Sequence, residues 1–458
     1  MRSAAALALA LLSACASAPT APVDPKDRLV VLISVDGLAA YYLNDPKAPL
    51  PTLRRMMREG AVAEGVYSSF PTVTWPNHTT LVTGVEPGKH GVIGNSYLDR
   101  STLEVVKLIP DPLFDKDQLV KVPTLYDAAH RAGLKTAGII WPASRNAKTL
   151  DWTVPDCMTK ELWDRYATPG WLEELRKENI PVDMQETWCK ANGGVQRDWM
   201  YARATAQVIR AHRPNLVLLH LVEVDHVEHA KGPRSPDAYW ACSHADDRVR
   251  DVVEAVEAAG LRDRTTFFVV SDHGFIAYTK QICPNVELRK AGMVKVEGEK
   301  TAPVQAYVVA QGGGAFVYVL DKSVTEKVKS LVGGLEGVSA LYDTSKYAEM
   351  GIATPTQDPR MPDFVLSAKD GYSFSDVAAG DEAVRAAGKP GEVKGSHGYH
   401  PSEPQMFATF IAWGAGIRPG VKLPVIRSVD VAPTIARLLG LRMENLDGKS
   451  RDEILTSP

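Results

Sequence analysis

Acidic residues and histidines occur together at two places in the sequence, and a further histidine lies at a third. The segment "DHVEH" holds Asp225 and His229 four residues apart, and "SDHG" holds Asp272 next to His273. A further histidine, His397, lies in the glycine-rich segment "KGSHGYHP". A carboxylate and an imidazole at positions i and i+4 of a helix can face one cation, whereas neighbouring residues converge on a metal only in a non-helical turn. Two such pairs and a loop histidine predict a dinuclear metal site.

A third carboxylate, Asp36, closes the apolar segment "VVLISVD". A lone aspartate after a strand is usually a turn residue or a helix cap, but three aspartates in this position, two of them beside histidines, indicate a shared site. Oxygen and nitrogen ligands without thiolates suit zinc, with manganese or iron as alternatives.

A candidate nucleophile lies in "FPTVTWPNHTTLVTG", residues 70–84. The hydroxyl of Thr74 becomes competent near neutral pH if a zinc ion lowers its pKa. Pro76 suits the first position of the helix that follows, and the free backbone N–H groups of that helix start can bind a phosphate-like anion. The alternative is that Thr74 merely caps the helix, and the two roles are compatible.

The elements that position these residues alternate along the chain. Apolar β-branched runs predict strands, and amphipathic segments between them predict helices. Nearly continuous hydrophobic strands separated by helices favour an α/β fold, with a mostly parallel central sheet covered by helices on both faces. Ligands bind beyond the carboxyl ends of such strands, where "VVLISVD", "LLHLVEVD" and "FFVVS" place the three aspartates.

Two stretches interrupt this alternation. Residues 150 to 200 contain several tryptophans, two cysteines and several prolines, and residues 283 to 395 contain the hairpin-like "AYVVAQGGGAFVYVL". We therefore expect one catalytic domain over residues 28–452, with inserted lid segments at these two places.

The N-terminus predicts export. The apolar run from Ala4 to Leu12 is too short to span a bilayer and matches a signal peptide. Its end, "LSAC", resembles the lipobox of bacterial lipoproteins, which makes residues 1–14 the signal peptide and Cys15 the lipid-carrying first residue. A plain signal peptide is the alternative. We expect residues 15–27 to form a flexible tether. The predicted location of the protein is the periplasm or the outer membrane of a bacterium.

The net charge of the chain argues against nucleic acids and anionic membranes as binding partners. The formal net charge is -3, so no basic surface favours a nucleic-acid polymer or an anionic membrane. We expect a small substrate, and contact with a membrane only through the N-terminal lipid. Four cysteines remain after Cys15, which in an exported protein predicts one or two disulfides without fixing their pairing.

Five motifs occur in a specific order: "SVDG", "FPTVTWPNHTTLVTGVEPGKHGVIGN", "EVDHVEHAKGP", "VVSDHG" and "GSHGYHP". In this the chain resembles the nucleotide pyrophosphatase/phosphodiesterase family of the alkaline phosphatase superfamily, from about Arg28 to about Leu441. The resemblance implies an alkaline phosphatase-like fold with two zinc ions. It implies that one zinc is held by Asp36, Thr74, Asp272 and His273, and the other by Asp225, His229 and His397.

The resemblance also implies the reaction. Thr74 would be the covalent nucleophile, and Asn95, in "HGVIGN", would help the Thr74 backbone N–H stabilise the phosphoryl oxygens. The implied activity is that of a zinc-dependent phosphodiesterase or nucleotide pyrophosphatase, which hydrolyses phosphodiester or phosphoanhydride bonds through a covalent phosphothreonine intermediate. The substrate would be a small phosphodiester or a nucleotide.

Several alternatives stay open from the sequence. Trp75 occupies the position at which nucleotide-hydrolysing relatives stack an aromatic ring on the base, but packing in the core explains it equally well. His220 stands where some nucleotide-specific relatives have tyrosine, which leaves a lipid-derived diester possible. Arg145 and Lys148 follow "IIWPAS" and could bind the extra negative oxygen of a monoester, so a phosphate monoesterase stays an alternative. A phosphonate hydrolase of the same superfamily is another. A non-catalytic metal-binding surface lipoprotein is an alternative of another class. The presence of Thr74 argues against it, because a binding protein needs no nucleophile.

Overall fold

The computed structural model describes residues 23–109, 113–298 and 300–456. The predicted signal peptide and Cys15 lie outside these residues, so export and lipidation stay predictions. Within the described part of the chain, no helix combines the length and the apolar character that crossing a bilayer requires.

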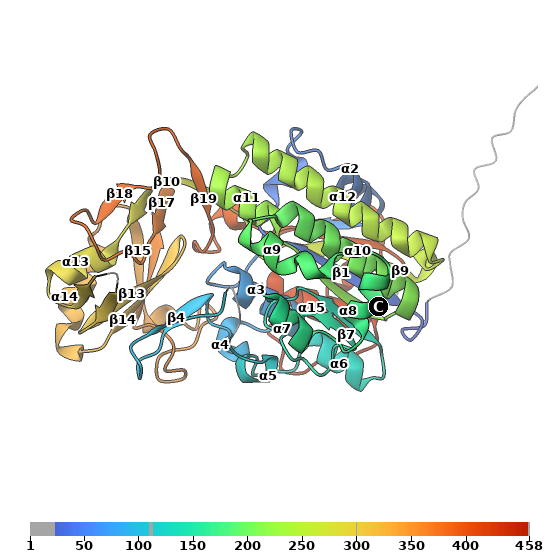
Figure 1. Ribbon diagram of the computed structural model, residues 1–458, viewed down its shortest axis with the longest axis horizontal. Coiled ribbons are helices and arrows are strands. Elements are labelled where there is room, and N and C mark those ends of the chain that lie inside the picture. Colours follow the sequence, from blue (N-terminus) through green and yellow to red (C-terminus); the bar gives the residue numbers. More distant parts are fainter. Residues whose placement is uncertain (1–22, 110–112, 299, 457–458) are drawn as a thin grey trace, which may run out of the picture.

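An eight-stranded sheet forms the centre of the structure (Figure 1). Strand β1 (Leu29–Val35) is parallel to both of its neighbours, β8 (Leu216–Leu221) and β9 (Thr265–Val270), whereas β20 (Phe410–Gly414) runs antiparallel to β9. The sheet order is β21 (Val421–Leu423), β2 (Ala61–Ala63), β20, β9, β1, β8, β6 (Thr136–Ile139) and β7 (Trp152–Val154). The predicted α/β fold with a mostly parallel sheet is confirmed.

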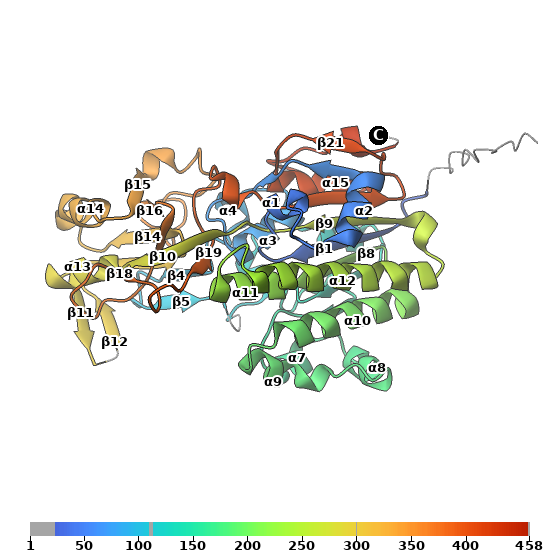
Figure 2. The same ribbon diagram turned by 90° about the horizontal axis from the view of Figure 1, so that it is seen from above.

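Both faces of this sheet are covered by helices (Figure 2), which matches β1: it is buried at every position, apolar except at Ser34, and alternates its side chains between the two faces. Val31 and Ile33 pack in one core cluster with helices α2 (Pro51–Glu59), α10 (Gly194–His212) and α12 (Pro236–Ala258). Val30 and Leu32 pack in another with α3 (Thr74–Thr83), α6 (Leu125–Arg131) and α15 (Val431–Leu438). Even-numbered residues of β1 therefore face α3, the helix that begins at the candidate nucleophile.

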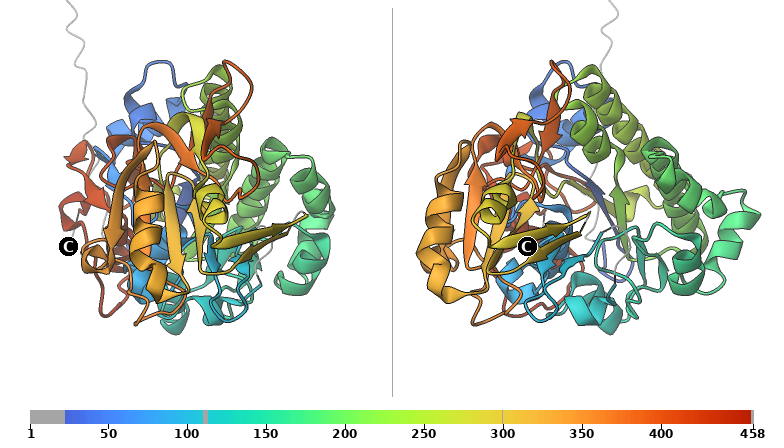
Figure 3. Two further views of the ribbon diagram at one scale, coloured as in Figure 1. Left: turned by 90° about the vertical axis from the view of Figure 1, so that its left-hand side faces the viewer. Right: turned by 60° about the vertical axis from the view of Figure 1, so that its left-hand side comes forward.

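Residues 276–396 form a β-rich part at one end of the molecule (Figure 1), which faces the viewer in Figure 3, left; most of a second core cluster lies in it. Its first strand, β10 (Ile276–Ile282), pairs with its last, β19 (Lys394–Ser396). The predicted hairpin is present as β13 (Ala306–Gln311) and β14 (Gly314–Val319). A four-stranded sheet of order β13, β14, β16 (Phe364–Ala368) and β15 (Val338–Asp343) lies beside helices α13 (Pro284–Lys290) and α14 (Thr325–Gly333).

The other unusual stretch folds as short helices beside α10 (Figure 2). These are α7 (Lys160–Tyr166), α8 (Trp171–Lys177) and α9 (Gln185–Lys190). Trp163 and Trp171 are buried in the same core cluster as α10, so these tryptophans pack in the interior. Cys242 and Cys283 are buried free thiols, which excludes both from the predicted disulfides in this structure.

One strand prediction was wrong at its end. The segment "LLHLVEVD" was expected to stay extended as far as Asp225, but β8 ends at Leu221 and helix α11 (Glu223–Lys231) begins two residues later. The carboxylate of Asp198 accepts hydrogen bonds from the backbone N–H groups of Val222 and Glu223, at 2.8 and 3.1 Å. These bonds satisfy N–H groups that the first turn of a helix leaves without a partner, which explains why the chain turns here.

Candidate metal centre and nucleophile

Helix α11 brings the first acidic residue and histidine together. Asp225 and His229 lie one turn apart, and His229 Nε2 is 3.4 Å from Asp225 Oδ1. His397, which follows β19, places its Nε2 at 3.1 Å from His229 Nε2 and 3.6 Å from Asp225 Oδ1. The remaining ring nitrogens, Nδ1 of His229 and Nδ1 of His397, face backbone carbonyls of Gly395 and Thr72. Two Nε2 atoms that converge on a carboxylate, with Nδ1 directed to carbonyls, suit a metal ligand set.

A second group adjoins the first. The ligand atoms of Asp36, Asp225 and His273 all lie within 4.8 Å of one another. His273 Nε2 is 3.4 Å from Asp36 Oδ1 and 3.1 Å from Asp272 Oδ2. The rings of His273 and His397 stack at 3.8 Å between centroids, so the two groups lie side by side. The structure thus brings together all the acidic and histidine residues of both predicted ligand sets, with Asp225 common to the two groups.

Unsatisfied atoms at this centre provide a test of whether a cation fits. Oδ1 of Asp36, Oδ1 of Asp225, Oδ2 of Asp272 and Nε2 of His273 are buried and have no hydrogen-bond partner among the described residues. A buried polar atom without a partner costs about 1–3 kcal/mol, and more if it is charged. Four such atoms in one cluster, all of them lone-pair donors when Nε2 of His273 is unprotonated, fit divalent cations.

Electrostatics supports the same conclusion. Burial raises the pKa of Asp36, with the charge of Asp225 adding to the effect, and burial together with the charge of Asp36 raises the pKa of Asp272. Burial and the neighbouring His229 lower the pKa of His397 to about 4, which keeps that imidazole neutral and able to coordinate. Like-charged carboxylates held this closely out of water call for positive charge between them.

Thr74 is the first residue of α3, and Val73, with an extended backbone, is its N-cap. The expectation that Pro76 begins the helix was therefore wrong by two residues. The alternative that Thr74 caps the helix is also excluded, because Val73 occupies that position and the helix has no side-chain cap. The side chain of Thr74 is thus not committed to capping.

Asn95 is joined to the same helix start. Its Oδ1 accepts a hydrogen bond from the Trp75 N–H at 3.0 Å. The N–H of Trp75 is bonded to Asn95, and Pro76 has no N–H. Of the first three residues of α3, only Thr74 therefore offers a backbone N–H to a bound anion. With Oδ1 engaged, the amide Nδ2 of Asn95 is the group left to donate. Thr74 N–H and Asn95 Nδ2 are therefore the donors that the helix start can offer to an anion.

The tryptophan beside the nucleophile is buried. Trp75 is 1% exposed and belongs to the core cluster that contains Ile93, Tyr97 and Ala143. The ring packs against the core here, and its contact with substrate stays a prediction.

Two histidines that were not predicted to act at the metal centre contact its carboxylates. His220 Nε2 is 2.8 Å from Asp36 Oδ2. His78 Nδ1 is 2.9 Å from the Thr74 carbonyl oxygen and 3.5 Å from Asp272 Oδ2. The one signal for His220 was its place as a polar residue in the otherwise apolar run "LVLLHL".

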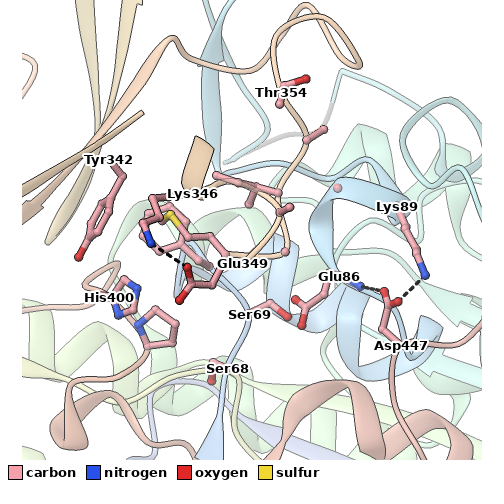
Figure 4. A pocket seen from close by; sticks show the side chains of 18 of the residues that line it. Ser68, Ser69, Glu86, Lys89, Tyr342, Lys346, Glu349, Thr354, His400 and Asp447 are labelled. Atoms are coloured by element: carbon pink, nitrogen blue, oxygen red, sulfur yellow. Dashed lines mark hydrogen bonds and ion pairs between the residues drawn. The ribbon is translucent and has the colours of Figure 1, made fainter. Parts of the chain in front are cut away.

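A separate cavity of about 940 Å³ is lined in part by the segment that precedes Thr74 (Figure 4). Its lining includes Ser69, Phe70, Glu349 and His400, and none of the predicted ligands or Thr74. Figure 4 shows His400 beside Tyr342 and Ser69 near Glu86. This cavity is therefore distinct from the metal centre.

Comparison with known proteins agrees with this geometry. The family model described as "Type I phosphodiesterase / nucleotide pyrophosphatase" matches residues 30–400. Ectonucleotide pyrophosphatase/phosphodiesterase family member 7 of Mus musculus is 24% identical over 445 residues, which cover 96% of this chain and 89% of the relative. Family member 3 of Rattus norvegicus is 26% identical over 268 residues, but these cover only 57% of this chain and 26% of that longer protein.

A solved structure shares the fold. Murine ectonucleotide pyrophosphatase/phosphodiesterase 5, in an inactive form in complex with AMP, superposes with a TM-score of 0.71 at 20% sequence identity, over 94% of this chain and 100% of that chain. The match of the family model over most of the sequence decides the assignment. The chain belongs to the type I phosphodiesterase/nucleotide pyrophosphatase family, a family of hydrolases that act on phosphoric ester bonds.

Proposed function

We propose that this protein is a zinc-dependent hydrolase of small phosphodiesters or nucleotide pyrophosphates, with Thr74 as its covalent nucleophile. The observation that carries the proposal is the position of Thr74 at the start of α3, where His78 bridges its carbonyl to Asp272 beside two adjoining ligand groups. The names of the relatives support the substrate class, and the solved relative in complex with AMP supports a nucleotide.

Two zinc ions fit the residues that are present. One would be held by Asp36, Thr74, Asp272 and His273, and the other by Asp225, His229 and His397. Bound zinc would supply Lewis acidity, which lowers the pKa of the Thr74 hydroxyl and neutralises charge that develops on the phosphoryl group.

The residues of the chain would carry out a double displacement. Thr74 Oγ gives its proton to solvent and attacks phosphorus, the bond from phosphorus to the leaving oxygen breaks, an ester on Thr74 forms, and the leaving oxygen departs as an anion or takes a proton from solvent. Thr74 N–H and Asn95 Nδ2 donate hydrogen bonds to a phosphoryl oxygen during both steps. Water then attacks the same phosphorus, the bond to Thr74 Oγ breaks, and the hydroxyl regains a proton.

The partners of two nearby positive side chains favour a diester substrate over a monoester. A monoester brings an additional negative oxygen, which Arg145 or Lys148 was a candidate to bind. Arg145 instead donates to Asp115 at 2.7 Å and its guanidinium lies over the Tyr166 ring, while Lys148 donates to Asn146 at 2.5 Å. Both cations are thus engaged by neighbouring side chains, so we favour phosphodiesterase activity over the monoesterase alternative.

A comparison of three chromogenic substrates tests the proposal. We expect a higher kcat/KM for bis(p-nitrophenyl) phosphate than for p-nitrophenyl phosphate, and a further gain with thymidine 5′-monophosphate p-nitrophenyl ester if a nucleoside is recognised. Preference for the monoester would overturn the diesterase assignment. No hydrolysis of any of the three by zinc-loaded protein would favour the non-catalytic metal-binding lipoprotein. Export to the bacterial periplasm, with or without a lipid on Cys15, belongs to the same proposal and can be tested by fractionation.

A further inference from the structure

His220 is a polar residue in a buried and otherwise apolar strand of the central sheet. It lies in β8, is 2% exposed, and follows four buried apolar residues. In the parallel register His220 is opposite Ser34 of β1. Because alternate residues of a strand share a face, Asp36, two residues after Ser34, projects from the same face as His220. The sheet register therefore places this histidine beside a predicted metal ligand.

Both nitrogens of the His220 ring face oxygen acceptors. Nε2 is 2.8 Å from Asp36 Oδ2, and Nδ1 is 3.1 Å from the carbonyl oxygen of Ile140. Hydrogen bonds to both acceptors need an N–H on each ring nitrogen, so the geometry is that of the doubly protonated ring, with the Nε2 edge directed at the carboxylate.

The backbone of Ile140 is strained in the conformation that presents this carbonyl. Ile140 has a φ of 56°, in the left-handed region that a β-branched residue rarely adopts. Such a conformation persists where the surroundings impose it, often at a functional site. The anchor of the His220 ring is thus held in a conformation that the local sequence alone disfavours.

The hydrogen bond to His220 makes the two oxygens of the Asp36 carboxylate different. Oδ2 is occupied by His220, whereas Oδ1 is buried, has no hydrogen-bond partner among the described residues, and lies 3.4 Å from His273 Nε2. Asp272 shows the same arrangement, because its Oδ1 accepts from the Gly37 N–H at 3.2 Å and its Oδ2 has no such partner. In both residues one oxygen is fixed by the protein and the other is left for a cation.

We propose that His220 is a positioning residue, which orients Asp36 as a one-oxygen metal ligand and is itself anchored by the strained carbonyl of Ile140. The inference rests on the proposed function, since it concerns the same metal centre. It predicts that the Nε2 contact, and not the volume of the ring, sets the affinity of the centre for zinc and the rate of the reaction.

Two substitutions separate the ring nitrogens. In His220→Gln the side-chain amide nitrogen lies near the former Nε2 and can still donate to Asp36, whereas in His220→Asn it lies near the former Nδ1 and can reach only Ile140. Zinc affinity is measured by competition with a chromogenic chelator, and kcat and KM with bis(p-nitrophenyl) phosphate at saturating zinc. The same pair at His244, a buried histidine of α12 outside the site, serves as the control.

We expect His220→Gln to keep zinc affinity within about threefold of the wild type. His220→Asn should lose about 10–100-fold in zinc affinity and in kcat, with a smaller change in KM, as is typical when the partner of a metal ligand is removed. Equal zinc affinity in the two variants, together with equal loss of thermal stability in their metal-free forms, would overturn the proposal and leave His220 a packing residue. A wild-type protein that binds no zinc would instead overturn the proposed function itself.

Discussion

Asn95 Oδ1 accepts a hydrogen bond from the backbone N–H of Trp75, the residue that follows the nucleophile, at 3.0 Å. This bond fixes which end of the Asn95 amide faces the start of α3 and leaves Nδ2 as its donor. The same side chain therefore has an acceptor that holds the helix start and, in the proposed mechanism, a donor for the phosphoryl group.

Asn95→Asp separates these two functions. The carboxylate still accepts from the Trp75 N–H but cannot donate to a phosphoryl oxygen, so we expect kcat to fall by about 10²–10³-fold with little loss of stability. Asn95→Ala should show a similar fall in kcat and also unfold at lower temperature, because the Trp75 N–H loses its partner. Wild-type turnover by Asn95→Asp would exclude Nδ2 as a donor to the phosphoryl group.

Metal content should respond differently to the two ligands on α11. His229→Ala should lose about one equivalent of zinc. Asp225, assigned to the same zinc, also has a ligand atom within 4.8 Å of those of Asp36 and His273, so Asp225→Ala should lose more. Inductively coupled plasma mass spectrometry of dialysed protein measures the content. His226→Ala, on the same helix but in neither group, is the matched control. Full metal content in His229→Ala would refute the ligand assignment.

Acid stability should depend on His90, in the short helix α4 (Pro87–His90). Its Nδ1 accepts from the Val92 N–H at 3.2 Å, and burial lowers its pKa to about 3, against 6.5 in an exposed histidine. Between these values the unfolded chain binds the proton and the folded chain does not. The stability that neutral His90 permits is thus complete above pH 6.5 and is lost as the pH falls towards 3, by up to about 1.4 kcal/mol per pH unit.

His90→Asn removes this titration and keeps an acceptor near the Val92 N–H. Denaturant unfolding in the presence of a chelator should show a shallower loss of stability between pH 6.5 and 3, by about one proton. The same substitution at His130, whose side chain is 43% exposed, controls for the exchange of a histidine elsewhere. An unchanged pH dependence in His90→Asn would show that His90 does not couple folding to protonation.

The sequence predicted those features that depend on local pattern. Continuous β-branched runs identified β1 and β9, and the spacing in "DHVEH" allowed Asp225 and His229 to share a helix face, which α11 confirms. The end of β8 was missed because Asp198, a residue of α10, supplies the hydrogen bonds that start α11. No local pattern reveals a partner that lies so far along the chain.

The role of His220 was missed for the same reason. Its partners are Asp36 and the Ile140 carbonyl, and both contacts arise from the order of strands in the sheet and from a strained backbone. A single polar residue in an apolar strand shows that a buried partner must exist, but not which residue it is.

Thr74→Ala tests the central claim most directly, when zinc content and turnover of bis(p-nitrophenyl) phosphate are measured on one preparation. The structure places Thr74 at the start of α3, with its side chain not engaged in capping. We therefore expect the variant to fold, to keep most of its zinc, and to lose about 10³-fold or more in kcat, because no covalent ester can form. Turnover near that of the wild type in the zinc-loaded variant would contradict the assignment of Thr74 as the nucleophile.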